Sequence, residues 1–226
     1  MDETNKRSFD TALRPISGRD VAASLGPRPI AVIGARDGDE ICFATVAWAT
    51  PISHTPPMVA FALRAKSRTF QLARKSGRFS ISAPDERLAD AVNACGNTSG
   101  NAVDKSALVE WALARGGGEP PLSAQRTATQ PDGSDGEPLP GADPAGTRGA
   151  DSPTLQADAE ALPVLAGALT AFSCRVESIA EAGDHMLVTG TVERAWSRAG
   201  KDARGRIDPT DALLCIQHDL FATLER

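Results

Sequence analysis

FATVAWATPISHTPPMVAFALRAKSRTFQLARKSGRFSIS, residues Phe43 to Ser82, alternates short apolar runs with polar breaks. Apolar runs of this length, rich in valine, isoleucine and phenylalanine and bounded by proline or glycine, are typical of β-strands. They predict strands at 58–64 and 78–83. Between these strands, Ser67 is a good helix N-cap and Gly77 a good helix stop, and the residues between them place apolar side chains on one side. The stretch is therefore predicted to fold as strand, helix, strand.

The residues before this stretch extend the pattern toward the N-terminus. An apolar run at 29–35 and another at 40–48 are separated by Asp37-Gly38, which is a strong signal for a β-hairpin. Residues 50–57, TPISHTPP, are predicted to form a loop that Pro56 and Pro57 keep extended.

After residue 83 the pattern becomes mixed. Helices are predicted at 86–95 and 105–115. Residues 116–157 are rich in Gly, Pro, Ser, Asp and Thr, with almost no large apolar side chain. Such a segment cannot bury enough surface to offset the entropy lost on ordering, so it is predicted to be a mobile insert. Strand patterns resume at about residue 167.

Near the C-terminus, Gly183-Asp184 forms a turn signal directly ahead of an alternating, strand-like run. His185 then lies at a strand mouth, where its imidazole either reaches a pocket or simply faces solvent at a hairpin corner. Strands outnumber helices and several are hairpin partners. The chain is therefore predicted to be mainly β, a closed antiparallel barrel with added helices.

Composition excludes several classes of protein. The 226 residues carry a net charge of -5, so no basic face for nucleic acid is indicated. The four cysteines lie far apart without metal-ligand spacing, which favours reduced thiols and no metal site. No apolar run approaches the length of a membrane span. We expect a soluble, cytoplasmic protein that is not a membrane protein.

The start of the predicted helix at Ser67 is a candidate anion site. Ser67 and Thr69 supply hydroxyl groups, Arg68 supplies a fixed positive charge, and the first backbone N–H groups of a helix have no partner within the helix. These features suit a phosphate. The alternative is that Ser67 only caps the helix while Arg68 is solvated.

The order of these motifs resembles the flavin reductase-like family, whose fold is the antiparallel FMN-binding split β-barrel. The opening stretch carries the resemblance, together with CGNTSGNAVDK, Cys95 to Lys105, which is similar to the family's SG-x-x-x-DK pattern, and the Gly-Asp-His at 183–185. The resemblance covers 27–104 and 162–224. It implies one domain at 27–226, interrupted by the insert, after an N-terminal extension at 1–26.

The resemblance also implies a set of site residues. A strand-to-loop segment is expected to hold the edge of the flavin ring: Thr45, Val46, Ala47, Trp48, Ala49 and Thr50. The helix start is expected to bind the flavin phosphate through Ser67, Arg68 and Thr69, and a loop with Ser99, Gly100 and Lys105 to close over the flavin. His185, beside the nicotinamide, is expected to be the catalytic residue.

The function implied is that of an NAD(P)H-dependent flavin reductase, an oxidoreductase that passes hydride from NADH or NADPH to flavin. FMN is the expected flavin and FAD the alternative. The implied assembly is a homodimer, and a monooxygenase or an electron-transfer protein is the candidate partner. Two other functions stay open: a flavoredoxin-like electron carrier that keeps its FMN, and a split barrel that binds flavin weakly or not at all.

Overall fold

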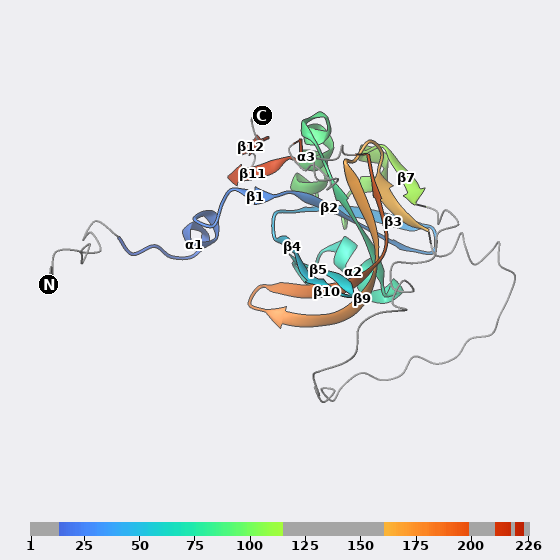
Figure 1. Cartoon of the computed structure of the whole chain (residues 1–226), viewed down its shortest axis with the longest axis horizontal. Coiled ribbons are helices and arrows are strands. Elements are labelled where there is room, and N and C mark those ends of the chain that lie inside the picture. Colours follow the sequence, from blue (N-terminus) through green and yellow to red (C-terminus); the bar gives the residue numbers. More distant parts are fainter. Residues whose placement is uncertain (1–13, 115–160, 199–210, 218–219, 224–226) are drawn as a thin grey trace, which may run out of the picture.

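The computed structural model describes residues 14–114, 161–198, 211–217 and 220–223. Its centre is a seven-stranded sheet in which every neighbouring pair is antiparallel, in the order β3-β2-β6-β9-β10-β5-β4 (Figure 1). The strands are β2 (Ala31–Asp37), β3 (Glu40–Val46), β4 (Ala49–His54), β5 (Pro57–Leu63), β6 (Arg78–Ala83), β9 (Thr170–Ala182) and β10 (His185–Ser197). The prediction of a mainly β, antiparallel protein with added helices is confirmed.

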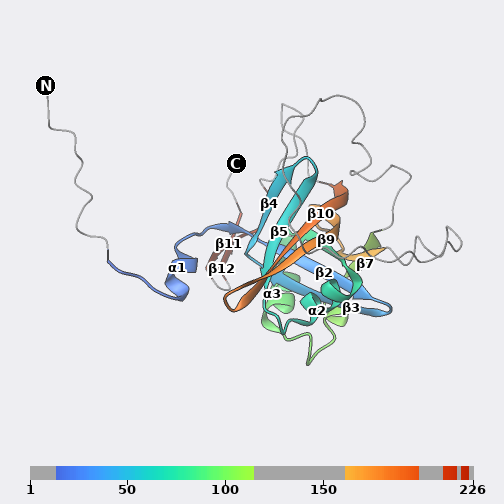
Figure 2. The same cartoon turned by 90° about the horizontal axis from the view of Figure 1, so that it is seen from below.

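Two smaller sheets and a few helices complete the described fold. β1 (Arg28–Pro29), β11 (Leu214–Gln217) and β12 (Leu220–Ala222) form one sheet, and β7 (Trp111–Ala114) with β8 (Leu162–Leu165) forms the other. The helices are α1 (Arg19–Ala23), α2 (Arg68–Ser76) and α3 (Ala89–Asn97), with short 3-10 turns η1 (Glu86–Leu88) and η2 (Lys105–Leu108). In both views α1 projects from the body of the molecule (Figures 1 and 2).

Strand β2 explains why the core has two parts. Its side chains alternate between two apolar clusters, with Ile33 packed among residues of α2 and Val32 among residues of α3 and β8. Both side chains are fully buried. A strand covered on both faces reads as a continuous apolar run, as residues 31–35 do. α2 and α3 therefore lie on opposite faces of this part of the sheet.

Helix α2 and the two predicted hairpins form where the sequence places them. Ser67 is the N-cap of α2, and Gly77 ends the helix in the left-handed conformation with φ 69°. Asp37 pairs with Glu40 across the first hairpin, and His185 pairs with Ala182 across the second, where Gly183 has φ 64°. A positive φ suits glycine, which has no Cβ to clash.

Two predictions are wrong. Residues 49–54 form strand β4 instead of a loop. β4 is an edge strand, which tolerates the missing N–H of Pro51; Pro51 lies opposite Val59, and a register shift follows it. The predicted helix at 105–115 is η2 followed by strand β7. Trp111 of β7 pairs with Leu165, and so distant a partner leaves no local signal in the sequence. The predicted mobile insert at 116–157 lies outside the described residues.

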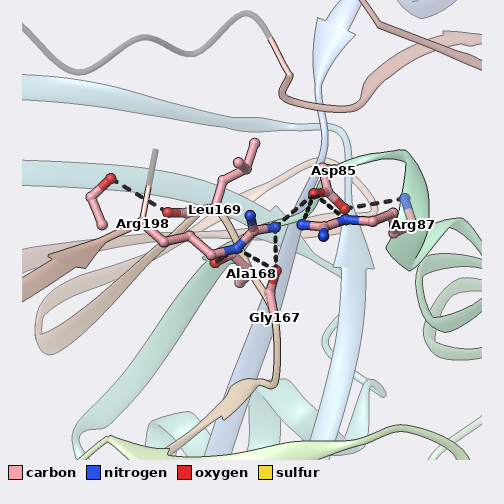
Figure 3. A network of polar contacts seen from close by, with 7 residues as sticks. Asp85, Arg87, Gly167, Ala168, Leu169 and Arg198 are labelled. Atoms are coloured by element: carbon pink, nitrogen blue, oxygen red, sulfur yellow. Dashed lines mark hydrogen bonds and ion pairs between the residues drawn. The ribbon is translucent and has the colours of Figure 1, made fainter. Parts of the chain in front are cut away.

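An ionic cluster ties three segments together outside the main sheet. The Asp85 carboxylate, 5% exposed, accepts hydrogen bonds from Arg87 and from Arg198 at 2.6 Å each (Figure 3). Arg198 also donates to the carbonyls of Gly167 and Ala168 at 2.7 and 3.1 Å. The cluster therefore joins the segment after β6, the turn before β9 and the end of β10.

Candidate functional site

The candidate site is a cavity of about 680 Å³ between β3, at one edge of the main sheet, and strands β5 and β10 near its other edge. It is lined by the end of β3 and the link to β4, the end of β5 and the start of α2, the end of α3 with the loop and η2 after it, and the first residue of β10. The size lies within the range of small-molecule sites in proteins. Eleven of the predicted site residues line it: Thr45, Val46, Ala47, Trp48, Ser67, Arg68, Thr69, Ser99, Gly100, Lys105 and His185.

The remaining two predicted residues, Ala49 and Thr50, begin strand β4 and do not line the cavity. Thr50 is exposed, and its hydroxyl donates to the carbonyl of Pro51 at 3.2 Å. The family resemblance groups these two residues with those before them. Strand β4 begins at Ala49, however, and leads the chain away from the cavity.

The wall near β3 is held by hydrogen bonds to neighbouring elements. The Thr45 hydroxyl donates to the Val92 carbonyl of α3 at 2.6 Å, and the Val46 side chain is in the core. Ala47 and Trp48 lie between β3 and β4, outside both strands. Both line the cavity, and the Trp48 carbonyl accepts a hydrogen bond from the Ala62 N–H of β5 at 2.9 Å.

The start of α2 contributes backbone N–H groups. The N-cap Ser67 makes no side-chain capping bond, so its hydroxyl is not committed to the helix. The first N–H groups of a helix have no intrahelical acceptor, and the helix dipole favours an anion near them. The Thr69 side chain, 1% exposed, points to Cys42, whose Sγ lies 3.3 Å from its hydroxyl.

The positive charge of Arg68 was expected to serve a phosphate at the helix start, but the guanidinium is engaged by a carboxylate of the chain. Its Nε and Nη2 both donate to the carboxylate of Glu40, and its Nη1 donates to Gln71 at 3.2 Å. The hydrogen bond from Arg68 holds the pKa of Glu40 below its usual value. The sequence does not indicate this pair, because Glu40 lies 28 residues away on β3.

The loop after α3 is held against the connection into α2. The Asn101 side chain donates to the carbonyl of Lys66 at 2.9 Å, and both residues line the cavity. A Cβ on Gly100 would come within 2.5 Å of Cys42 Sγ, so only glycine allows this approach. Asn101 and Lys66 line the cavity but were not among the predicted site residues. For Asn101, the polar NTSGN run was the one local signal of a site.

Lys105 is the buried charge of the site. It is 6% exposed, and its Nζ donates to the carbonyl of Cys95 at 2.5 Å. Burial lowers the pKa of this ammonium, and burial raises the pKa of the Cys95 thiol to about 11. The thiol is thus a poor nucleophile at neutral pH.

His185 stands at the cavity rim between two contacts. Its ring centroid lies 4.7 Å from that of Trp48, with the ring planes tilted by 53°, and its Nδ1 lies 2.7 Å from the Asp184 carboxylate. This contact lowers the pKa of Asp184. An ionised carboxylate only accepts, so Nδ1 carries a proton and a neutral ring leaves Nε2 as an acceptor.

The four cysteines are buried, and none of them is in a disulfide. Among the residues that the structure describes, no group of three or more His, Cys, Asp or Glu side chains could hold a metal ion. No helix in the described ranges has both the length and the apolar character needed to cross a membrane.

Comparisons with known proteins agree with this arrangement. The family model described as "Flavin reductase like domain" matches residues 24–130 and 137–221. An FMN-binding protein from Thermus thermophilus, solved with 1-cyclohex-2-enone, is 25% identical with a TM-score of 0.66, over 94% of this chain and 93% of that chain. Comparison with curated proteins gave no match.

Two further solved structures share the fold at lower identity. An NADH:FAD oxidoreductase from Streptomyces globisporus is 17% identical with a TM-score of 0.62, over 95% of this chain and 99% of that chain. The styrene monooxygenase flavin reductase from Pseudomonas putida S12 is 20% identical with a TM-score of 0.59, over 92% of this chain and 97% of that chain.

Proposed function

The chain belongs to the flavin reductase-like family, and from that premise we propose that it is an NAD(P)H-dependent flavin reductase. One observation carries the proposal. A single cavity combines a helix start and a buried ammonium, which suit a phosphate, with an aromatic rim of Trp48 and His185. A flavin nucleotide has this combination of a charged tail and a flat ring.

The residues present fit a flavin in three respects. The cavity volume is that of a small-molecule site. The Lys105 ammonium is buried, and no carboxylate in the described part of the chain pairs with it. An anionic ligand would supply the missing counter-charge. The backbone N–H groups of Ala47 and Trp48, in the link between β3 and β4, would be the donors to the edge of a ring. When bound, the flavin supplies the hydride acceptor.

The chain's own contribution to the reaction is positional. Asp184 fixes the imidazole of His185 with Nε2 free, and Trp48 limits its rotation. A neutral His185 would then accept a hydrogen bond from the carboxamide N–H of a nicotinamide and orient that ring. Holding two rings in reactive geometry lowers the barrier without a proton-transfer group.

The assembly and cellular context proposed are those implied by the family. We propose a split β-barrel that pairs as a homodimer, with FMN as the preferred flavin and a monooxygenase as the partner. The four buried cysteines, none of them in a disulfide, support a cytoplasmic location.

The test is a spectrum and an assay on the purified protein. We expect NADH or NADPH oxidation that depends on added FMN or FAD, with saturation in flavin. Tightly bound FMN without flavin-dependent oxidation would instead favour the flavoredoxin-like carrier. Absence of any flavin binding, by visible spectrum and by equilibrium titration, would contradict both functions.

A further inference from the structure

The cavity is lined by positive charge, although the chain as a whole carries a net charge of -5. Its lining includes four cationic side chains: Arg64, Lys66, Arg68 and Lys105. No aspartate or glutamate of the described residues lines it. A cleft whose charges have one sign concentrates ligands of the opposite sign. The cavity is therefore suited to ligands that carry several negative groups.

Arg64 differs from the other two arginine and lysine side chains whose contacts are known. Glu40 pairs with Arg68, and Lys105 is buried against the Cys95 carbonyl at the end of α3. Arg64, by contrast, is exposed and forms no ion pair with any residue that the structure describes. Its guanidinium is available to a ligand that enters the cavity from solvent.

The register of the main sheet places Arg64 beside His185. β5 ends at Leu63, which pairs with Met186 of β10, so Arg64 and His185 stand across from each other one position further along, and both line the cavity. Directly opposite residues of an antiparallel pair have Cβ atoms about 5 Å apart. The pKa of Asp184 is lowered mainly by its hydrogen bond with His185, and the charge of Arg64 contributes to the same shift. Arg64 therefore lies close to the Asp184–His185 pair.

This position determines which negative group Arg64 can reach. His185 is the proposed contact for the carboxamide of a nicotinamide, so the guanidinium across from it lies near the substituent on the nicotinamide ring nitrogen. In NADH and NADPH that substituent is a ribose, and the phosphate on this ribose is the negative group nearest to the ring. An arginine can bind a phosphate through two parallel hydrogen bonds. Arg64 and His185 together therefore match the charged and the amide groups of one nicotinamide nucleotide.

We propose that Arg64 is a specificity-determining residue that binds the phosphate on the nicotinamide ribose of the reductant, while His185 orients the carboxamide. This inference rests on the proposed function. NADH and NADPH share this phosphate, so Arg64 selects phosphorylated nicotinamides without distinguishing the two dinucleotides. The diphosphate of FAD is the other source of the same chemistry, and the test separates the two ligands.

The test uses FMN-saturated protein and two reductants that differ only in the phosphate. Reduced nicotinamide mononucleotide carries it and reduced nicotinamide riboside does not, so the ratio of their kcat/KM values isolates the contact. We expect Arg64→Met to lower this ratio by roughly fivefold to fiftyfold, as for a charge-assisted hydrogen bond that stays in contact with solvent. The loss should fall on KM more than on kcat, and the riboside should be nearly unaffected. NADH and NADPH should be weakened by the same factor.

An equilibrium titration makes the same comparison without turnover. The oxidised mononucleotide and the oxidised riboside are titrated into FMN-loaded protein, and the ratio of the riboside Kd to the mononucleotide Kd should fall by a similar factor in Arg64→Met. Arg64→Lys keeps the charge but not the planar fork of donors, so it should preserve part of the ratio.

Two control variants make the result specific. Lys66→Met removes another exposed cation of the cavity, two residues beyond the position across from His185, and should lower the ratio less than Arg64→Met. Lys75→Met on α2 removes a charge outside the cavity, where the lysine pairs with Asp37, and should leave the ratio unchanged.

The outcomes separate this inference from the proposed function. A wild-type ratio in Arg64→Met overturns the role of Arg64, as does an equal loss in Lys66→Met, which would indicate a general attraction by the charge of the cavity. A loss of FAD affinity relative to FMN, with both reductant ratios unchanged, would assign Arg64 to the flavin and also overturn the proposal. Wild-type protein that oxidises none of the reductants with FMN or FAD contradicts the proposed function itself; the titration with the oxidised mononucleotide and riboside then still decides the role of Arg64.

Discussion

The ring of His185 is held by contacts from two different elements. Asp184, in the β9–β10 turn, bonds its Nδ1, and Trp48, in the link between β3 and β4, packs beside it with the two ring planes tilted by 53°. His185 is half-buried, whereas Trp48 is 42% exposed. A histidine that merely ended a hairpin would not need a partner from the β3–β4 link. The arrangement leaves one ring nitrogen toward the cavity, which is the position for an orienting contact.

The first prediction concerns this ring. His185→Ala should keep flavin affinity while slowing flavin reduction by NAD(P)H about tenfold to a hundredfold. That loss corresponds to about 1.4–2.7 kcal/mol in barrier, as one lost orienting contact would cost. Stopped-flow measurement of flavin bleaching gives the rate. His54→Ala, which changes an exposed histidine of β4 outside the cavity, is the control. A wild-type rate in His185→Ala would show that the histidine is structural.

At the scale of elements, neighbouring strands of the main sheet pack so closely at Gly190 of β10 that there is no room for a side chain. A Cβ on Gly190 of β10 would lie 2.5 Å from Cε1 of Phe79 and 2.8 Å from the carbonyl of Arg175. Phe79 is fully buried and stacks edge-on against Phe61, with ring centroids 4.9 Å apart. Neither the backbone of β9 nor a buried ring can move without cost.

Gly190→Ala should therefore destabilise the fold by about 1–3 kcal/mol through overpacking. Gly96→Ala is the matched control. Its Cβ would meet nothing nearer than Thr45 Cβ at 3.4 Å, and alanine favours a helix over glycine, so stability should stay equal or rise. Denaturant unfolding of both variants measures the difference. Equal stability of Gly190→Ala and wild type would mean that β9 and β10 separate more readily than their packing implies.

At the scale of the whole molecule, the Asp85 cluster holds together the chain segments at the adjoining ends of β6, β9 and β10, which are neighbours in the main sheet. Burial by itself would raise the pKa of Asp85, but the hydrogen bonds from Arg87 and Arg198 outweigh it and the net pKa is lowered. A carboxyl group whose folded pKa lies below its unfolded value contributes stability above the unfolded pKa. That contribution is lost as the pH falls through the folded pKa.

Asp85→Asn should lower the free energy of unfolding at pH 7 by about 1–3 kcal/mol, with the loss moderated because both arginines are partly exposed. The difference between variant and wild type should shrink below about pH 4, where the carboxylate of the unfolded wild-type chain becomes protonated. Glu86→Gln, at the exposed neighbouring position, should match wild type. Denaturant unfolding at pH 7 and at lower pH measures this; a difference constant with pH would contradict the assignment.

The strands on either side of the long insert are already adjacent. Ala114 at the end of β7 is paired with Leu162 at the start of β8. Replacing residues 116–157 with a short Gly/Ser linker should therefore preserve the fold and the flavin affinity. Closing a shorter loop costs less entropy, so stability should be unchanged or higher by up to about 2 kcal/mol. Thermal unfolding and flavin titration measure both. A large loss of stability would show that the removed segment packs elsewhere.

The sequence by itself determined the elements whose signals are local. Ser67 and Gly77 mark the two ends of α2, Asp37-Gly38 and Gly183-Asp184 mark hairpins, and apolar alternation marks most strands, because capping, turn geometry and periodicity act within a few residues. The motif order also indicated the family and eleven residues that line the cavity.

Only the tertiary structure decided the features that depend on distant partners. β7 is a strand because β8, on the far side of the long insert, pairs with it, although the local pattern is helical. β4 is a strand because the next strand, β5, pairs with it across a hairpin, although the local prolines favour a loop. The charges of Arg68 and Lys105 also depend on distant partners. Glu40 of β3 forms an ion pair with Arg68 of α2, and the folded core excludes water from Lys105. Pairing and burial are sums over residues far apart in the chain, so no single stretch of sequence carries them.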